Sequence, residues 1–174
     1  MDTRHPACFS GYRPSKFSFP LLGDQEAYRK LESEIKAEVL KAVNDGYAAF
    51  LCGMAEGFDL LCGQIVLELK QGHGDCSGLF LTAVPPYRGH RFSGTWGIIH
   101  KRLMSLADEI VYPTDRQNSH VYHIRNRYMV NNSTRLICYY DGQAGGTKYT
   151  VEYARRKGLE IINLHPRAMG LEKR

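Results

Sequence analysis

The chain has 174 residues, of which 43% are hydrophobic and 24% charged, and such a length and balance are typical of one globular domain with its own core. No apolar run approaches the roughly 18–20 residues that cross a bilayer, and residues 1–9 include Asp2, Arg4 and Pro6, which are foreign to a signal peptide. We therefore expect a cytoplasmic protein. The net charge of +5 favours an anionic partner without identifying it.

Short apolar runs alternate along the chain with longer amphipathic segments, which indicates strands and helices in turn. In chain order, the pattern predicts strand 7–10, helix 24–45, strand 47–51, helix 56–71, strand 78–84, helix 95–107, strand 109–112, helix 121–132, strand 135–140, helix 147–157 and strand 160–164. Asp24 is the expected N-cap of the first helix, and Gly46 follows its end.

Six strands alternating with five helices predict an α/β fold, a single Rossmann-like three-layer domain with a mostly parallel sheet. Continuous apolar strands agree with a sheet that helices cover on both faces. We assign residues 1–166 to this domain and residues 167–174 to a loose C-terminal tail.

Glycines and charged residues gather directly after four of the predicted strands, in residues 10–14, 52–59, 85–88 and 141–147. Such loops meet at one edge of a parallel sheet, where ligands bind at the switch in strand order. Glycine at a strand-to-helix turn lets backbone N–H groups approach a phosphate, and the helix dipole favours the negative charge. The sequence therefore predicts a phosphate pocket at this edge, although each glycine loop alone also fits a plain tight turn.

The residues predicted to bind the ligand come from these loops and from the fourth helix, whose arginines have a planar fork suited to phosphate oxygens. They are Gly11, Arg13, Gly53, Glu56, Gly57, Asp59, Pro85, Arg125, Arg127, Gly145, Gly146 and Thr147. At most one or two of residues 125–127 can reach the pocket, because consecutive helical residues point in different directions; a solvated helix face is the alternative. Capping of the second helix is the alternative for Glu56 and Asp59.

Metal sites and several common nucleotide motifs are not expected. His120 and His123 have no Cys, Asp or Glu cluster beside them, so a metal site is disfavoured. The five cysteines show no C-x-x-C spacing and are expected to be free thiols, most of them buried. No P-loop, G-x-G-x-x-G or G-x-S-x-G pattern occurs, which excludes an ordinary P-loop NTPase, NAD dehydrogenase or α/β-hydrolase.

Three blocks together resemble the SLOG superfamily, which joins the DNA-processing protein DprA (Smf) and the LOG-type nucleotide hydrolases, and most closely its YpsA-like branch. Residues 10–16 are similar to the branch's T-G-H-R-P-x-K, with Tyr12 in place of histidine. Residues 51–59 are similar to S-G-x-A-x-G-x-D, and residues 125–133 are similar to the R-N-R-I-I helix of DprA proteins. The blocks keep their order within residues 8–164. The resemblance implies a Rossmannoid fold, nucleotide or nucleic-acid phosphate held by these loops, and a homo-oligomer.

The resemblance leaves the activity open. LOG enzymes cleave the base from a nucleoside monophosphate, and their motif P-G-G-x-G-T-x-x-E has a glutamate three residues after the threonine. Thr150 occupies that position here, the nearest acid is Glu152, and the proline and one glycine are missing. Arg125 does match the arginine of the LOG helix motif.

Three functions are consistent with the sequence. The first is binding or sensing of a nucleotide or an NAD- or ADP-ribose-type ligand, with no required cofactor. The second is hydrolysis of an N-glycosidic bond in a nucleoside monophosphate or NAD-like ligand, for which the candidate catalytic residues are Glu56, Asp59, Arg125 and Glu152.

The third function is DprA-like binding of single-stranded DNA. Tyr87, Phe92 and Trp96 would then stack against bases, with packing in the core or in an interface as the alternative. Residues 88–96 are expected to form a lid or an interface.

Overall fold

The computed structural model describes residues 6–72, 74–115 and 118–168. Their strands and helices alternate as predicted, with an additional 3-10 helix, η1, after the first strand. The elements are β1 (Ala7–Gly11), η1 (Pro14–Lys16), α1 (Glu26–Asn44), β2 (Ala49–Cys52), α2 (Phe58–Gln71), β3 (Phe80–Ala83), α3 (Gly94–Leu106), β4 (Glu109–Ile110), α4 (Val121–Asn131), β5 (Arg135–Tyr139), α5 (Gly146–Arg156) and β6 (Glu160–Asn163).

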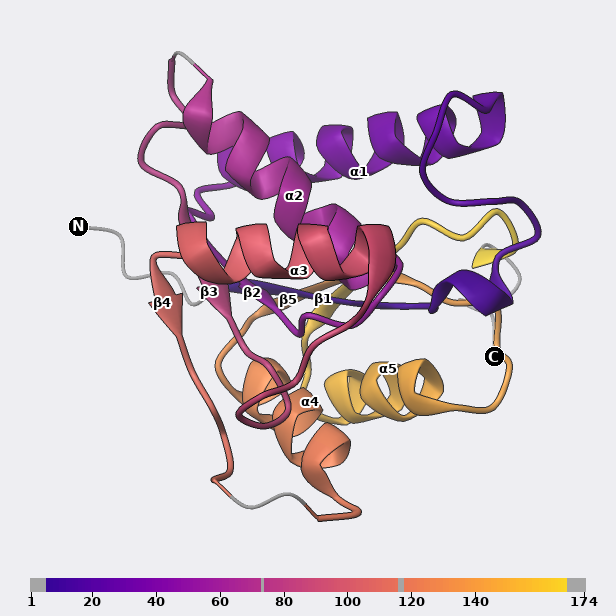
Figure 1. The fold of residues 1–174 in the computed structure, drawn as a ribbon, viewed down its shortest axis with the longest axis vertical. Helices are drawn as coiled ribbons and strands as arrows, with labels where there is room; N and C mark the ends of the chain where they lie inside the picture. Colours follow the sequence, from indigo (N-terminus) through magenta and orange to yellow (C-terminus); the bar gives the residue numbers. More distant parts are fainter. Residues whose placement is uncertain (1–5, 73, 116–117, 169–174) are drawn as a thin grey trace.

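The six strands form one sheet in the order β4-β3-β2-β1-β5-β6, and every neighbouring pair is parallel. Helices α1, α2 and α3 cover one face of the sheet, and α4 and α5 cover the other (Figure 1). This arrangement confirms the predicted three-layer α/β fold. Successive strands move outward from β1 to β4, and β5 then returns to the other side of β1. The switch point, where such sheets bind ligands, therefore lies between β1 and β5.

The end of β1 packs closely against the start of α2. A Cβ atom added to Gly11, at the end of β1, would lie 2.4 Å from the Phe58 ring at the start of α2. Gly57, just before α2, is equally confined, because its Cβ would lie 2.6 Å from the Tyr12 carbonyl oxygen. The Phe58 N–H donates to that same oxygen at 3.2 Å. The loop after β1 is thereby held against the first turn of α2, the turn that contains Asp59.

Some boundaries differ from the sequence prediction for local reasons. The N-cap of α1 is Gln25 and not Asp24, whose carboxylate accepts a hydrogen bond from Arg29 at 2.7 Å. The strand predicted over 109–112 is shorter, since β4 lies at the edge of the sheet and pairs with β3 over two residues. Residues 169–174 of the predicted tail lie outside the described residues, whereas Ala168 is buried.

None of the described helices is long and apolar enough to span a membrane. All five cysteines are unpaired, and four of them are buried, namely Cys8, Cys52, Cys62 and Cys138.

The connection between β3 and α3 packs through its aromatic rings. The His90 ring lies edge-on to Tyr87, Phe92 and His100, with centroid distances of 5.3, 4.8 and 5.4 Å. Phe92 and Trp96 are partly buried against the core. This packing agrees with the alternative that these aromatic residues pack in the core and do not stack against bases. His90 and His100 are both buried, and each has a buried ring nitrogen without a hydrogen-bond partner in the described part of the chain, Nδ1 in His90 and Nε2 in His100.

We expect the buried His90 to make the fold sensitive to acid. Burial lowers the pKa of His90 to about 4, and the charges of His100, Arg125 and Arg13 act in the same direction. The unfolded chain then takes up a proton before the folded one does, so stability is complete above pH 6.5 and falls as the pH drops toward 4. His90 should account for a loss of about 1–2 kcal/mol between pH 7 and pH 5.

Urea unfolding at these two pH values would measure this contribution as a difference between variants: the change in unfolding free energy from pH 7 to pH 5 should be about 1–2 kcal/mol more favourable in His90→Phe than in wild type, and unchanged in His120→Phe, where the side chain is exposed. Equal losses in wild type and His90→Phe would contradict a neutral, buried His90.

Candidate functional site

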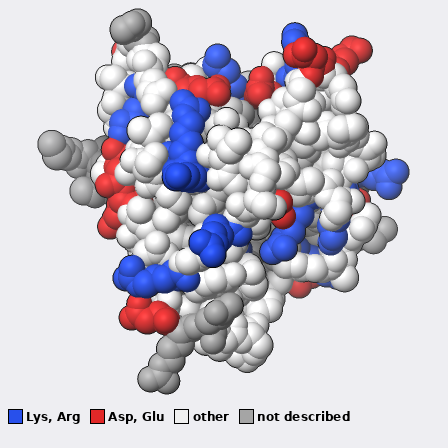
Figure 2. All heavy atoms as spheres, in the orientation of Figure 1, with Lys and Arg blue, Asp and Glu red and all other residues white. Residues whose placement is uncertain are grey.

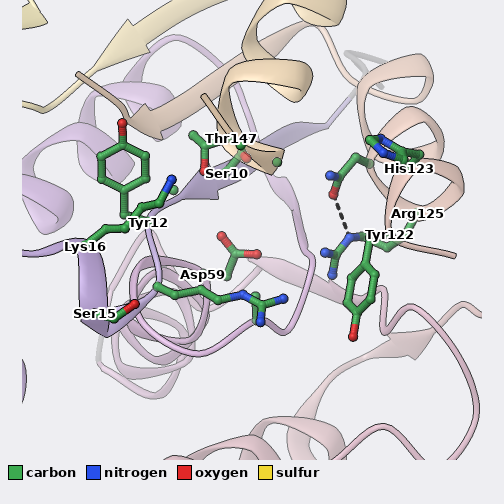
Figure 3. Close-up of a pocket in the computed structure, with 15 residues that line it drawn as sticks. Ser10, Tyr12, Ser15, Lys16, Asp59, Tyr122, His123, Arg125 and Thr147 are labelled. Atoms are coloured by element: carbon green, nitrogen blue, oxygen red, sulfur yellow. Dashed lines mark hydrogen bonds between the residues drawn. The ribbon is translucent and has the colours of Figure 1, made fainter. Parts of the chain in front are cut away.

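A cavity of about 520 Å³ opens at the carboxyl edge of the sheet, beside the switch point. Four segments form its walls: the loop after β1, the beginning of α2, one face of α4 and the beginning of α5 (Figure 3). The cavity, called the central pocket below, is lined by Ser10, Gly11, Tyr12, Arg13, Ser15, Lys16, Ala55, Asp59, Tyr122, His123, Arg125, Asn126, Gly145, Gly146 and Thr147.

The beginning of α5 presents free backbone N–H groups to the central pocket. Gly145 is the N-cap, with a φ of 145° that disfavours any side chain, and no side chain caps the helix. A Cβ at Gly146 would meet no atom within 4 Å, so the backbone there borders open space. Because the first turn of a helix has unpaired N–H groups and a positive dipole end, it attracts anions.

Basic side chains surround the same opening. The Lys16 ammonium donates to the Ala144 carbonyl at 3.1 Å and lies 4.9 Å from the centre of the Tyr12 ring. The exposed Arg13 guanidinium lies 5.6 Å from the centre of the Tyr122 ring. In Figure 2, basic side chains are spread over the face in view, and some of them lie on the right, the side where β1 ends in Figure 1. The rim of the central pocket is therefore positively charged.

A buried carboxylate and a buried guanidinium form the floor of the central pocket. Asp59 is 4% exposed, and its Oδ1 atom has no hydrogen-bond partner among the described residues. Burial raises the pKa of Asp59 to about 6, against the opposing effect of the Arg125 charge. Figure 3 shows this carboxylate in the middle of the labelled side chains, below Ser10 and Thr147. The floor of the central pocket thus contains a buried carboxylate beside a buried guanidinium.

Arg125 is fixed by its own partners. Its Nε donates to Asn126 Oδ1 at 2.7 Å, and its Nη1 donates to the Gly53 carbonyl. A Cβ at Gly53 would lie 2.9 Å from both Arg125 Nη1 and Asp59 Oδ2. Glycine at this position therefore leaves space for the two charged groups to flank the backbone.

Seven of the predicted site residues line the central pocket: Gly11, Arg13, Asp59, Arg125, Gly145, Gly146 and Thr147. Gly53 and Gly57 lie beneath it as close-packed backbone, next to Arg125 and to the loop after β1. The loops after β1, β2 and β5 thus contribute to one cavity, as expected for the carboxyl edge of a parallel sheet.

Other predicted residues lie outside the central pocket. Pro85 is buried, and neither it nor the half-buried Glu56 lines the cavity. Glu56 does not cap α2 either, because Gly57 is the N-cap and no side chain caps this helix. Arg127 instead donates from Nε to the Tyr149 hydroxyl of α5 at 2.5 Å.

Glu152 is exposed on α5, 3.9 Å from Lys148. Thr150, which occupies the LOG glutamate position, is 1% exposed and donates to the Gly146 carbonyl at 3.0 Å. Asp59 is therefore the only carboxylate among the described residues that line the central pocket.

Several lining residues were not among the predicted site residues, namely Ser10, Tyr12, Ser15, Lys16, Ala55, Tyr122, His123 and Asn126. Tyr12 donates its hydroxyl proton to Asp141, which connects the loops after β1 and β5. Tyr122 lies three residues before Arg125 on the same face of α4, with its ring centre 5.7 Å from the guanidinium. The i, i+3 spacing is the signal that could have identified Tyr122.

Comparison with known proteins identifies a family and several relatives with similar sequences. The YpsA family model, described as the YspA SLOG family, matches residues 7–164. The chain is 25% identical over 154 residues to the SPbeta prophage-derived protein YoqJ of Bacillus subtilis (strain 168), covering 79% of this chain and 88% of that protein. It is 24% identical over 161 residues to a UPF0398 protein of Bacillus cereus (strain B4264), covering 90% of this chain and 85% of the relative.

Among solved structures, DNA processing protein A (DprA) from Streptococcus pneumoniae has a similar fold, with a TM-score of 0.61 and 16% sequence identity. The match covers 92% of this chain and 50% of the DprA chain. This chain therefore corresponds to about half the length of that protein.

Proposed function

Because this chain belongs to the YpsA SLOG family, we propose that its central pocket binds the phosphate and ribose of a nucleotide. The observation that carries this proposal is the uncapped beginning of α5, which opens into the same cavity as Arg13 and Lys16. Backbone N–H groups and cations around one opening are complementary to a phosphate.

The position of Asp59 favours a ligand with a sugar next to the phosphate. Asp59 is the only carboxylate among the described residues that line the central pocket, and a carboxylate accepts hydrogen bonds from hydroxyl groups. A ribose hydroxyl that donates to this carboxylate would hold the sugar beside the phosphate. The ligand would then bridge the floor of the central pocket and its positively charged rim.

The phosphate contact can be tested with a charge placed beside it. Wild-type protein should bind at least one of AMP, GMP, CMP and UMP in calorimetry. Gly146→Asp should weaken that binding at least tenfold, about 1.4 kcal/mol, because the new carboxylate enters open space at the beginning of α5. The control is Gly78→Asp, at an exposed glycine whose Cβ also meets nothing within 4 Å. No binding at millimolar concentration, or equal binding by wild type and Gly146→Asp, would refute the proposal.

Hydrolysis of the N-glycosidic bond is the second candidate function, and the protonation of Asp59 is what favours it. A carboxyl group whose pKa is raised to about 6 can exchange protons near neutral pH, as general acid–base catalysis requires. Chromatography after long incubation with nucleoside monophosphates and with NAD would detect a free base. Release by wild type and its loss in Asp59→Asn would establish the activity, and absence of free base from wild type would exclude it.

The homo-oligomer implied by the family resemblance stays a prediction, which light scattering in solution would check.

A further inference from the structure

A second cavity of about 420 Å³ lies next to the central pocket. It is called the aromatic cleft below, and its walls include Lys16, Phe17, Phe19, Tyr139, His165 and Arg167. The cleft also contains one carboxylate, Asp141, which accepts hydrogen bonds from the Tyr12 hydroxyl and from Gln143. Lys16 lines both cavities. The two cavities are therefore neighbours on either side of one side chain, within the size range of small-molecule sites.

The Lys16 ammonium lies where the two cavities meet. It donates to the Ala144 carbonyl at 3.1 Å and would lie 2.9 Å from a Cβ at Gly145. Both residues belong to the loop that leads into α5. Because Lys16 is exposed, its hydrogen bond to Ala144 is in contact with water and can be exchanged for one to an anion. A negatively charged group at this boundary would contact Lys16 and the positive end of α5.

The aromatic cleft differs from the central pocket in having aromatic walls. Phe17 stacks on Tyr139 with a centroid distance of 4.6 Å and an interplanar angle of 21°. Phe19 is edge-on to Phe17 at 5.6 Å, and His165 is edge-on to Tyr139 at 4.7 Å. Phe19 and His165 remain partly exposed. Partly exposed aromatic rings held by their neighbours form a surface on which a planar ring can stack.

We propose that the aromatic cleft is the second half of the ligand site and receives the second ring-bearing half of a dinucleotide whose pyrophosphate lies at Lys16. This inference rests on the proposed function, since the first phosphate must lie at the beginning of α5. It narrows the ligand class to two nucleoside units joined through a pyrophosphate. A mononucleotide would fill the central pocket alone.

Calorimetry with AMP, ADP and NAD tests the proposal, because the three share the AMP unit. ADP adds a phosphate, and NAD adds both a phosphate and a second ring-bearing nucleoside. We expect NAD to bind about tenfold more tightly than ADP, the order of one stacked base. Phe19→Ala, in the aromatic cleft, should remove this difference without changing AMP binding. The matched control is Phe80→Ala, at an exposed phenylalanine at the start of β3.

A second variant tests the aromatic cleft independently, in case Phe19→Ala does not fold. Ser18 is exposed and lines the aromatic cleft, so Ser18→Trp should fill the cleft and abolish the advantage of NAD while AMP still binds. If AMP binds but NAD binds no more tightly than ADP, the extended site is wrong and the proposed function stands. If NAD keeps its advantage in Ser18→Trp and in folded Phe19→Ala, the second half lies elsewhere and the inference fails. If AMP, ADP and NAD all fail to bind at millimolar concentration, the inference fails, and the proposed function is then decided by its own test with the four nucleoside monophosphates.

Discussion

Gly57→Ala is expected to lower the free energy of unfolding by about 4 kcal/mol, from backbone strain and steric overlap together. Gly57 has a φ of +88° and a ψ of −129°, a conformation that alanine adopts only with strain. Its new Cβ would also lie 2.6 Å from the Tyr12 carbonyl oxygen and 3.0 Å from Pro14 Cδ. The nearest atom belongs to the backbone, so rotation of a side chain cannot relieve the overlap.

Urea unfolding followed by circular dichroism would measure the effect. Gly146→Ala is the control, because a Cβ there meets nothing within 4 Å and should change stability by no more than about 0.5 kcal/mol. A loss below about 1 kcal/mol in Gly57→Ala would show that the loop after β1 is not held against α2 as described.

Asp59→Asn is expected to stabilise the protein at pH 7.5 relative to wild type, with a benefit that disappears in acid. Burial raises the pKa of Asp59 from 3.8 to about 6, so the folded state takes up the proton more readily than the unfolded chain. Stability from this group is therefore present below pH 4 and is lost as the pH rises through 6. The pKa difference corresponds to about 3 kcal/mol, and asparagine has no carboxylate to ionise.

The measurement is the unfolding free energy of wild type and Asp59→Asn at several pH values between 4.5 and 8. The difference between the two proteins should grow with pH until about pH 7 and then level off. Asp75→Asn, at an exposed carboxylate, should follow wild type throughout. A difference that does not depend on pH would mean that Asp59 ionises as easily in the folded protein as in the unfolded chain.

The sequence was sufficient for the fold and for part of the central pocket. Alternation of apolar and amphipathic segments predicted all six strands and five helices, because each helix buries one face and the central strands bury both. The glycine loops indicated where the backbone approaches other groups, and Asp59 and Arg125 were both among the candidates. These predictions depend on short-range patterns that a single sequence records.

Features that depend on side-chain direction or on contacts between distant segments were missed. Arg127 is two residues from Arg125, yet it points to Tyr149 of α5 because successive helical residues are rotated by about 100°. Glu152 is exposed on α5 and does not line the central pocket. The aromatic cleft is formed by three separate segments, which contain Phe17, Tyr139 and His165. No local sequence pattern predicts that these segments lie side by side.

The pairing of β1 with β5 also sets the order in which the molecule can be completed. During synthesis, β1, α1, β2 and α2 emerge early and can begin to pack, but one edge of β1 stays open until β5 has been made. Contacts between segments so far apart in the chain form slowly. The parts of the central pocket that come from α4 and α5 are synthesised at the same late stage, so a nascent chain that stops before α4 has no complete central pocket. Any binding in the central pocket therefore requires that α4 and α5 have already packed onto the sheet.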